Sequence, residues 1–186
     1  MARSIAGDTG VHHAGITGCQ FAVVIIISGV SGVGKSLLGN LLAQELAFQF
    51  YDADDFHSHE SIEKMQSGIP LTDDDREPWL RRLRELIGQC LATNTGAVLA
   101  CSALKKKYRD LLRVSRQVQL VFLQGDYSVI AAQLKSRRGH FMNSNLLDTQ
   151  FADLEEPEPD EGAIVVQIGR PPRELLGEIV PQLRHP

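Results

Sequence analysis

The chain has 186 residues, of which 43% are hydrophobic and 23% are charged, which is typical of one globular domain and excludes disordered or collagen-like chains. Its 19 basic and 23 acidic residues give a formal net charge of -4. This balance offers no general attraction to nucleic acid or to an anionic membrane surface, so we expect neither as a partner.

The first segment, residues 1–21, is rich in glycine and lacks the basic and apolar regions of a signal peptide. We expect a flexible N-terminal extension, followed by one folded domain over residues 22–186. The longest apolar run, Phe21 to Ile27, is far shorter than the roughly 20 residues that span a bilayer, so it predicts a buried strand. The three cysteines lack the spacing of a zinc or redox motif, which favours a reducing compartment.

Short apolar runs then alternate with segments of helical period, a pattern typical of strands joined by crossover helices in an α/β protein. Several runs are almost continuously apolar, as central strands of a parallel sheet are. We therefore predict a doubly wound, parallel five-stranded sheet. The expected strands are Ala22–Ser28, Phe48–Tyr51, Ala97–Cys101, Val118–Leu123 and Ala163–Ile168.

Three segments carry an apolar face at helical spacing. Lys35–Ala47 has leucines every four residues, and Trp79–Leu91 continues the same period. We expect the second helix to start at Pro78, because proline is tolerated in a first turn. A last helix is expected after Pro171. The acidic stretch Glu155–Glu161 is predicted to be a solvated loop without a chemical role.

The first strand leads directly into Gly29-Val30-Ser31-Gly32-Val33-Gly34-Lys35-Ser36, a full match to the phosphate-binding P-loop motif. Backbone N–H groups of such a loop surround phosphates, and the helix that follows presents its positive end to the same anion. We expect Lys35 to contact the β- and γ-phosphates of ATP and Ser36 to ligate Mg²⁺. The residues assigned to ATP binding are Gly29, Val30, Ser31, Gly32, Val33, Gly34, Lys35, Ser36 and Leu37.

The second strand ends in Asp52-Ala53-Asp54-Asp55, at the carboxyl edge where parallel sheets bind ligands. Alternation along the strand puts Asp52 and Asp54 on one side. One carboxylate is expected to hold Mg²⁺ and the other to orient a substrate hydroxyl; we assign these roles to Asp52 and Asp54, respectively. The absence of an Asn-Lys-x-Asp segment argues against a GTPase, and the chain length argues against a motor ATPase. A metabolite or nucleotide kinase remains.

Five further segments follow the P-loop: Tyr51-Asp52-Ala53-Asp54-Asp55-Phe56-His57, Lys64-Met65 with Gly68-Ile69-Pro70-Leu71, Asp73-Asp74-Asp75-Arg76 with Pro78-Trp79-Leu80, Cys101-Ser102-Ala103-Leu104-Lys105-Lys106 with Tyr108-Arg109-Asp110, and Gly139-His140-Phe141. With these segments the chain resembles the gluconate kinases from about Val23 onward. The P-loop and the Asp-x-Asp feature are shared with shikimate kinases, whereas the segments around Arg76 and Lys105 are more specific.

The resemblance implies a gluconokinase, which transfers the ATP γ-phosphate to the 6-hydroxyl of D-gluconate with Mg²⁺, as a homodimer in the cytoplasm. Two alternatives stay open. One is another small-molecule kinase, with shikimate or a nucleoside monophosphate as acceptor. The other is a nucleotide-binding regulatory module without catalysis, suggested by the N-terminal extension and by Gln133, which stands where the family often has an arginine.

Gluconate carries a carboxylate and several hydroxyls, so its site needs a cationic anchor and polar partners. Arg76 is the first candidate, because a planar guanidinium binds a carboxylate through two hydrogen bonds. Lys105 and Arg109, just beyond the third strand, are the alternatives. His57 is expected to hydrogen-bond the sugar acid or to support a turn.

The basic segment Lys135–Phe141 follows a predicted helix and contains Gly139, a candidate hinge. We predict a mobile lid near residues 135–146, in which Arg137 stabilises the transferring phosphoryl group and His140 contacts the substrate. The alternative is a basic helix end that interacts with its own dipole.

Overall fold

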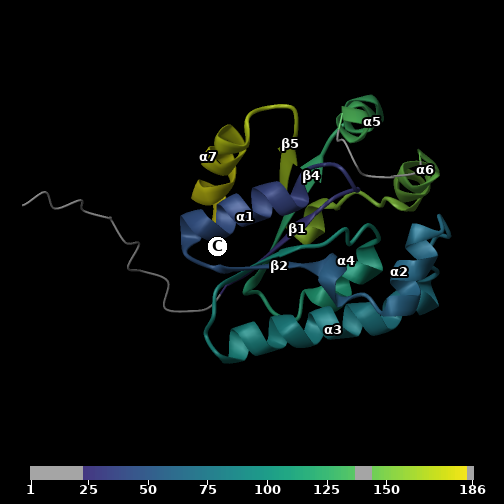
Figure 1. The fold of residues 1–186 in the computed structure, drawn as a ribbon. Coiled ribbons are helices and arrows are strands. Elements are labelled where there is room, and N and C mark those ends of the chain that lie inside the picture. The colour runs from purple at the N-terminus through teal and green to yellow at the C-terminus, as the bar shows by residue number, and fades with distance from the viewer. Residues whose placement is uncertain (1–22, 137–143, 184–186) are drawn as a thin grey trace, which may run out of the picture.

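The computed structural model describes residues 23–136 and 144–183, which fold around one parallel sheet (Figure 1). The strands lie in the order β2-β3-β1-β4-β5, and each neighbouring pair runs parallel. The α/β class and the five-stranded doubly wound sheet are thus confirmed, with every strand within two residues of its predicted bounds. The strands are β1 (Val24–Ser28), β2 (Gln49–Asp52), β3 (Ala97–Ala100), β4 (Val118–Gln124) and β5 (Ile164–Gln167).

Helices connect the strands and cover both faces of the sheet, with α1 and α7 on one face and α3 and α4 on the other (Figure 1). Among the described residues, no helix is long and apolar enough to cross a membrane. The helices are α1 (Lys35–Leu46), α2 (His59–Gln66), α3 (Asp73–Ala92), α4 (Lys106–Leu112), α5 (Tyr127–Ser136), α6 (Ser144–Asp153) and α7 (Pro172–Leu183), with 3₁₀ turns η1 (Ala53–Phe56) and η2 (Pro159–Glu161).

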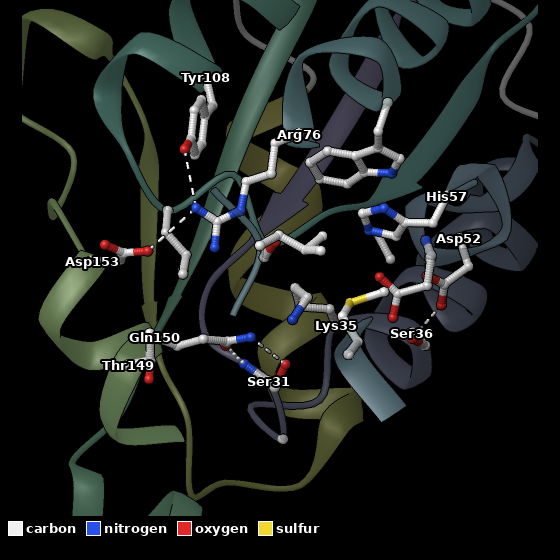
Figure 2. Close-up of a pocket in the computed structure, with 18 of the residues that line it drawn as sticks. Ser31, Lys35, Ser36, Asp52, His57, Arg76, Tyr108, Thr149, Gln150 and Asp153 are labelled. Atoms are coloured by element: carbon white, nitrogen blue, oxygen red, sulfur yellow. Dashed lines mark hydrogen bonds and ion pairs between the residues drawn. The ribbon is translucent and has the colours of Figure 1, made fainter. Parts of the chain in front are cut away.

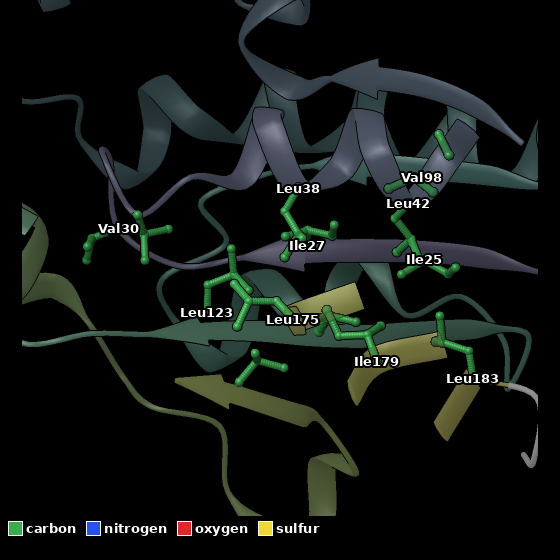
Figure 3. Packing of buried hydrophobic residues seen from close by; sticks show 14 of the residues in the cluster. Ile25, Ile27, Val30, Leu38, Leu42, Val98, Leu123, Leu175, Ile179 and Leu183 are labelled. Atoms are coloured by element: carbon green, nitrogen blue, oxygen red, sulfur yellow. The ribbon is translucent and has the colours of Figure 1, made fainter. Parts of the chain in front are cut away.

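Successive residues of the central strand β1 belong to two separate hydrophobic clusters, one on each face of the sheet. Ile25 and Ile27 pack with residues of α1 and α7, among them Ile179 (Figure 3). Val24 and Ile26 pack on the other face with residues of α3 and α4. Because burial of one such side chain contributes about 1.5–3 kcal/mol, these two clusters fix the position of the sheet and of the loops at its carboxyl edge.

The chain leaves β1 through the phosphate loop, and its first residue has to be glycine. Gly29 has a φ of +135°, and a Cβ there would lie 2.7 Å from the Leu123 carbonyl oxygen of β4. A side chain would meet both a strained backbone and a collision. Because β1, β2 and β3 run parallel, the loops that follow them lie at one edge of the sheet, where doubly wound sheets bind their ligands.

Helix α3 starts earlier than predicted, at Asp73 and not at Pro78. Thr72 caps it: its hydroxyl accepts a hydrogen bond from the Asp75 N–H, and the Asp75 carboxylate accepts one from the Thr72 N–H. This reciprocal capping box satisfies N–H groups that otherwise lack partners in a first turn. Pro78 lies inside the helix, in its second turn, where it removes one donor from the ladder.

The acidic stretch before β5 is not solvated throughout, which corrects the expectation from the sequence. Glu161, at the end of η2, is only 2% exposed. Arg109 of α4 is equally buried and donates from Nε and Nη2 to the two carboxylate oxygens of Glu161. Its donors are thus satisfied inside the protein, and Arg109 does not line the cleft described below. Its assignment as a reserve anchor for a substrate carboxylate is wrong.

Candidate active site

One cleft of about 420 Å³ opens at the carboxyl edge of the sheet (Figure 2). It is bounded by the phosphate loop, by the chain after β2 and by helices α3, α4 and α6. Most of the residues predicted from the sequence to form the site lie along its wall. They are Ser31, Gly32, Gly34, Lys35, Ser36, Leu37, Asp52, Asp54, His57 and Arg76.

The phosphate loop turns into α1 at Gly34, the N-cap residue, whose φ of +104° is easily adopted only by glycine. The Lys35 ammonium group donates to the Val30 carbonyl oxygen at 3.0 Å, so it lies over the loop. Val30 and Val33 are buried and do not line the cleft. These two residues belong to the predicted ATP site through their backbone, and their side chains hold the loop on the core.

The two predicted metal ligands contact each other. The Ser36 hydroxyl donates to Asp52 Oδ2 at 2.6 Å, and Asp52 Oδ1 accepts the Asp54 N–H at 3.1 Å. Mg²⁺ prefers oxygen ligands and usually keeps waters and phosphate oxygens beside one or two protein ligands. A hydroxyl and a carboxylate side by side fit this ion. Within residues 23–136 and 144–183, no cluster of three His, Cys, Asp or Glu residues offers another metal site.

Asp54 reaches the cleft by a different route from the predicted one. Strand β2 ends at Asp52 and the chain turns into η1, so alternation along a strand does not place Asp54. Both carboxylates line the cleft all the same. Although Asp54 keeps contact with solvent, partial burial raises its pKa and the Asp52 charge raises it further, while Lys35 lowers it. A carboxyl with a raised pKa is the better proton acceptor near neutral pH.

His57 stacks on Trp79, with ring centroids 4.5 Å apart and planes 8° from parallel. Trp79 is buried, and its indole N–H donates to the Ala53 carbonyl oxygen at 2.7 Å, which fixes α3 against η1. Burial, followed by the Arg76 charge, lowers the pKa of His57 to about 4. His57 is therefore neutral near pH 7, and its buried Nδ1 has no hydrogen-bond partner within the described part of the chain.

Arg76 of α3 reaches into the same cleft (Figure 2). Its Nη1 donates to the Tyr108 hydroxyl at 3.2 Å and to Asp153 Oδ2 at 3.4 Å. A planar guanidinium with five N–H donors suits a carboxylate, so Arg76 is a candidate anchor in the cleft, and in this structure a protein carboxylate, that of Asp153, contacts it. Lys105 lies outside the cleft wall, with its Nζ 3.3 Å from Asp73 Oδ1 and 3.4 Å from Asp153 Oδ1.

Helix α6 contributes residues that the sequence did not single out. The Ser31 N–H donates to Gln150 Oε1 at 2.6 Å, and Gln150 Nε2 donates to the Ser31 hydroxyl at 2.9 Å. Asp153, from the same helix, lies against Arg76. No motif marks these residues, because their contacts join positions more than 70 residues apart. Tyr108 is also new to the site, although it stands in a segment that carries the family resemblance.

Two predicted residues lie outside the described residues: Arg137 and His140, in the segment assigned to a lid. Within the predicted lid near residues 135–146, residues 135–136 end α5 and residues 144–146 begin α6. The roles of Arg137 and His140 stay predictions.

Known proteins of similar sequence are kinases, which agrees with the phosphate loop in the cleft. The family model for shikimate kinase matches residues 31–166. The thermoresistant gluconokinase of Escherichia coli K12 is 45% identical over 150 residues, which cover 80% of this chain and 86% of that protein.

Solved structures agree. The gluconokinase of Sinorhizobium meliloti 1021 aligns with a TM-score of 0.80 at 42% identity, over 88% of this chain and 93% of that one. The shikimate kinase of Aquifex aeolicus aligns with a TM-score of 0.55 at 19% identity, over 87% of this chain and 96% of that one. The second likeness supports the P-loop kinase fold alone.

Proposed function

The chain belongs to the family of the shikimate kinase model and, by its curated relatives, to the gluconokinases, and we propose that it transfers the γ-phosphate of ATP to the 6-hydroxyl of D-gluconate. The products are 6-phospho-D-gluconate and ADP, so the protein is an ATP-dependent carbohydrate kinase. Identity of 45% to a gluconokinase, against 19% to a solved shikimate kinase, favours gluconate over shikimate as the acceptor.

One observation carries the proposal: a phosphate loop, a pair of carboxylates and an arginine line a single cleft (Figure 2). A sugar acid has a carboxylate at one end and a primary hydroxyl at the other. Arg76 suits the carboxylate, and Asp54 beside Lys35 suits the hydroxyl that attacks phosphorus. His57, neutral and stacked on Trp79, suits the hydroxyls between them.

The transfer makes one bond and breaks one. The 6-oxygen of gluconate bonds to the γ-phosphorus, and the bond from that phosphorus to the β–γ bridging oxygen breaks, leaving ADP. Asp54 holds the attacking hydroxyl and accepts its proton. Lys35 and the N–H groups of the phosphate loop stabilise the negative charge on the phosphoryl oxygens.

Ser36 and Asp52 are the residues that would hold Mg²⁺. The ion neutralises charge on the β- and γ-phosphates when it is bound with ATP. The Asp52 carboxylate is held in place by the Asp54 N–H and the Ser36 hydroxyl, so it is oriented before any ligand arrives.

A panel of acceptors tests the proposal. ADP release from Mg-ATP would be measured with D-gluconate, shikimate, a nucleoside monophosphate and no acceptor. We expect kcat/KM for gluconate to exceed that of every other acceptor by at least about 100-fold, equivalent to about 2.7 kcal/mol in the transition state. Preferential turnover of shikimate would indicate a shikimate kinase and not a gluconokinase. ATP binding without turnover of any acceptor would indicate a regulatory module.

The homodimer and the cytoplasmic location belong to the same proposal, and both rest on the resemblance to gluconate kinases. Light scattering coupled to gel filtration measures the mass of the protein in solution and so tests the homodimer. A mass of one chain, 20.5 kDa, across the working concentration range would exclude the dimer.

A further inference from the structure

The contact between Gln150 and Ser31 occupies a backbone donor of the phosphate loop. The Ser31 N–H belongs to the phosphate loop, whose backbone donors normally surround phosphate oxygens. Here that N–H donates to Gln150 Oε1 at 2.6 Å, and the same carboxamide donates back to the Ser31 hydroxyl at 2.9 Å. This backbone donor is therefore not available to a phosphate oxygen while the contact with Gln150 is present.

The contact between Asp153 and Arg76 occupies the group that the acceptor needs. Asp153 Oδ2 lies 3.4 Å from Arg76 Nη1, and Asp153 Oδ1 lies 3.4 Å from Lys105 Nζ. A protein carboxylate therefore sits on the cation that we assign to the carboxylate of gluconate. Both carboxylates would compete for one guanidinium and repel each other at short range.

Gln150 and Asp153 are three residues apart on α6, which is the spacing of one helix face. That face touches the phosphate loop at one point and Arg76 at the other (Figure 2). We propose that Gln150 and Asp153 are built-in competitors of the two substrates, and that α6 couples the two binding sites. The acceptor half of this inference rests on the function proposed above.

The coupling follows from the helix being one rigid element. ATP that displaces Gln150 removes one of the contacts that hold α6 over the cleft, so the acceptor displaces Asp153 at a lower free-energy cost. Each substrate then tightens the binding of the other, by the same factor in both directions. If α6 did not link the two sites, the Kd of each substrate would not depend on whether the other substrate is bound.

Calorimetric titration of the full chain tests the proposal, with a non-hydrolysable ATP analogue, with gluconate, and with each in the presence of the other. In the wild type we expect each ligand to lower the Kd of the other by about 5-fold or more. Gln150→Ala should bind the analogue alone about 3- to 10-fold more tightly, since one competing hydrogen-bonded contact is gone. Asp153→Asn should do the same for gluconate alone, and both variants should show reduced coupling.

The cross effect separates competition from simple damage. Gln150→Ala should also tighten gluconate binding, although Gln150 lies at the nucleotide side, and a misfolded variant would lose affinity and not gain it. Asp148→Asn is the matched control, because it makes the same charge change on the same helix at a residue that accepts a hydrogen bond from the Tyr127 hydroxyl. Neither Kd should change in it.

Weaker binding of the analogue by Gln150→Ala, or of gluconate by Asp153→Asn, would overturn the proposal, because those residues would then be ligands of the substrates. Unchanged coupling in both variants would overturn it as well. The analogue arm does not depend on the acceptor, so it decides the role of Gln150 even if the panel of acceptors rejects gluconate. In that case the acceptor arm is run with the acid that the panel identifies.

Discussion

Arg109 and Glu161 form an ion pair that is buried on both sides, with 1% of each side chain exposed. Arg109 Nε lies 2.6 Å from Glu161 Oε2, and Nη2 lies 2.7 Å from Oε1. The remaining nitrogen, Nη1, donates to the carbonyl oxygens of Leu104 and Glu155. One guanidinium thus joins α4, the loop after β3 that lines the cleft, and the segment that follows α6.

We expect removal of either partner to destabilise the fold, because the other charge would remain buried without its counter-ion. Glu161→Gln or Arg109→Met should lower the free energy of unfolding by about 3–5 kcal/mol, measured by urea denaturation. Lys106→Met is the control: Lys106 pairs with Glu158 and Asp160 at the surface, where ion pairs contribute little. Equal losses in the buried and exposed variants would contradict this account.

The same pair makes stability depend on pH. Contact with Arg109 lowers the pKa of Glu161 below its ordinary value of 4.5. A carboxyl of this kind stabilises the fold above its unfolded pKa, and the stabilisation is lost as the pH falls through the folded pKa. The difference in unfolding free energy between wild type and Glu161→Gln should therefore be smaller at about pH 4 than at about pH 7. An identical difference at the two pH values would refute the assignment.

The sheet and the phosphate loop could be predicted because local patterns encode them. Apolar runs of strand length predicted all five strands, and the Gly29–Ser36 motif predicted the turn from β1 into α1. The start of α3 was missed because Thr72 and Asp75 form a capping box within a run of acidic residues, which the apolar periodicity does not mark.

Long-range contacts could not be predicted in this way. Asp54 was assigned to the cleft through strand alternation, yet a 3₁₀ turn brings it there. Arg109 has the same local sequence context as a surface residue of a short helix, and only the fold brings Glu161 against it. The contacts of Gln150 and Asp153 depend on where α6 packs, and no pattern within that helix indicates its neighbours.

We expect Lys35→Met to lower kcat at least about 100-fold, because the variant loses a cationic donor to the phosphates. The fold should persist, since Lys35 contacts the loop backbone and the cleft and is not part of either hydrophobic cluster. Far-UV circular dichroism measures the fold and an ADP-release assay measures the turnover. Lys106→Met is the control, because it makes the same substitution at a residue outside the cleft. Near-native turnover in folded Lys35→Met would remove the P-loop assignment.

Arg76→Ala should raise the gluconate KM about 10- to 150-fold, equivalent to about 1.5–3 kcal/mol for a lost charge-assisted contact, and should not raise the ATP KM. Arg76→Lys should lie between the two, because it keeps the charge without the bidentate geometry. Arg81→Ala is the matched control on the same helix, since Arg81 is exposed and pairs with Glu77. If Arg76→Ala leaves the gluconate KM as it is, the anchor has to be sought at Lys105.

Asp54→Asn keeps the shape of the side chain but removes the charge that accepts the proton of the hydroxyl. ATP should still bind, while kcat should fall by about 10²- to 10⁴-fold, the usual contribution of general-base assistance and positioning. The raised pKa of Asp54 also places the acid limb of the kcat/KM profile above 3.8, the ordinary pKa of an aspartate, and that limb should be absent in the variant.

Asp52→Asn should behave differently, because Asp52 contacts Ser36 at the predicted metal site. Its defect should be relieved in part by raising Mg²⁺, whereas that of Asp54→Asn should not. The measurement is kcat of both variants across a Mg²⁺ titration at saturating gluconate, with Asp55→Asn as the neighbouring control outside the cleft wall. Rescue of Asp54→Asn alone would exchange the two roles, and wild-type turnover of Asp54→Asn would remove it from the reaction.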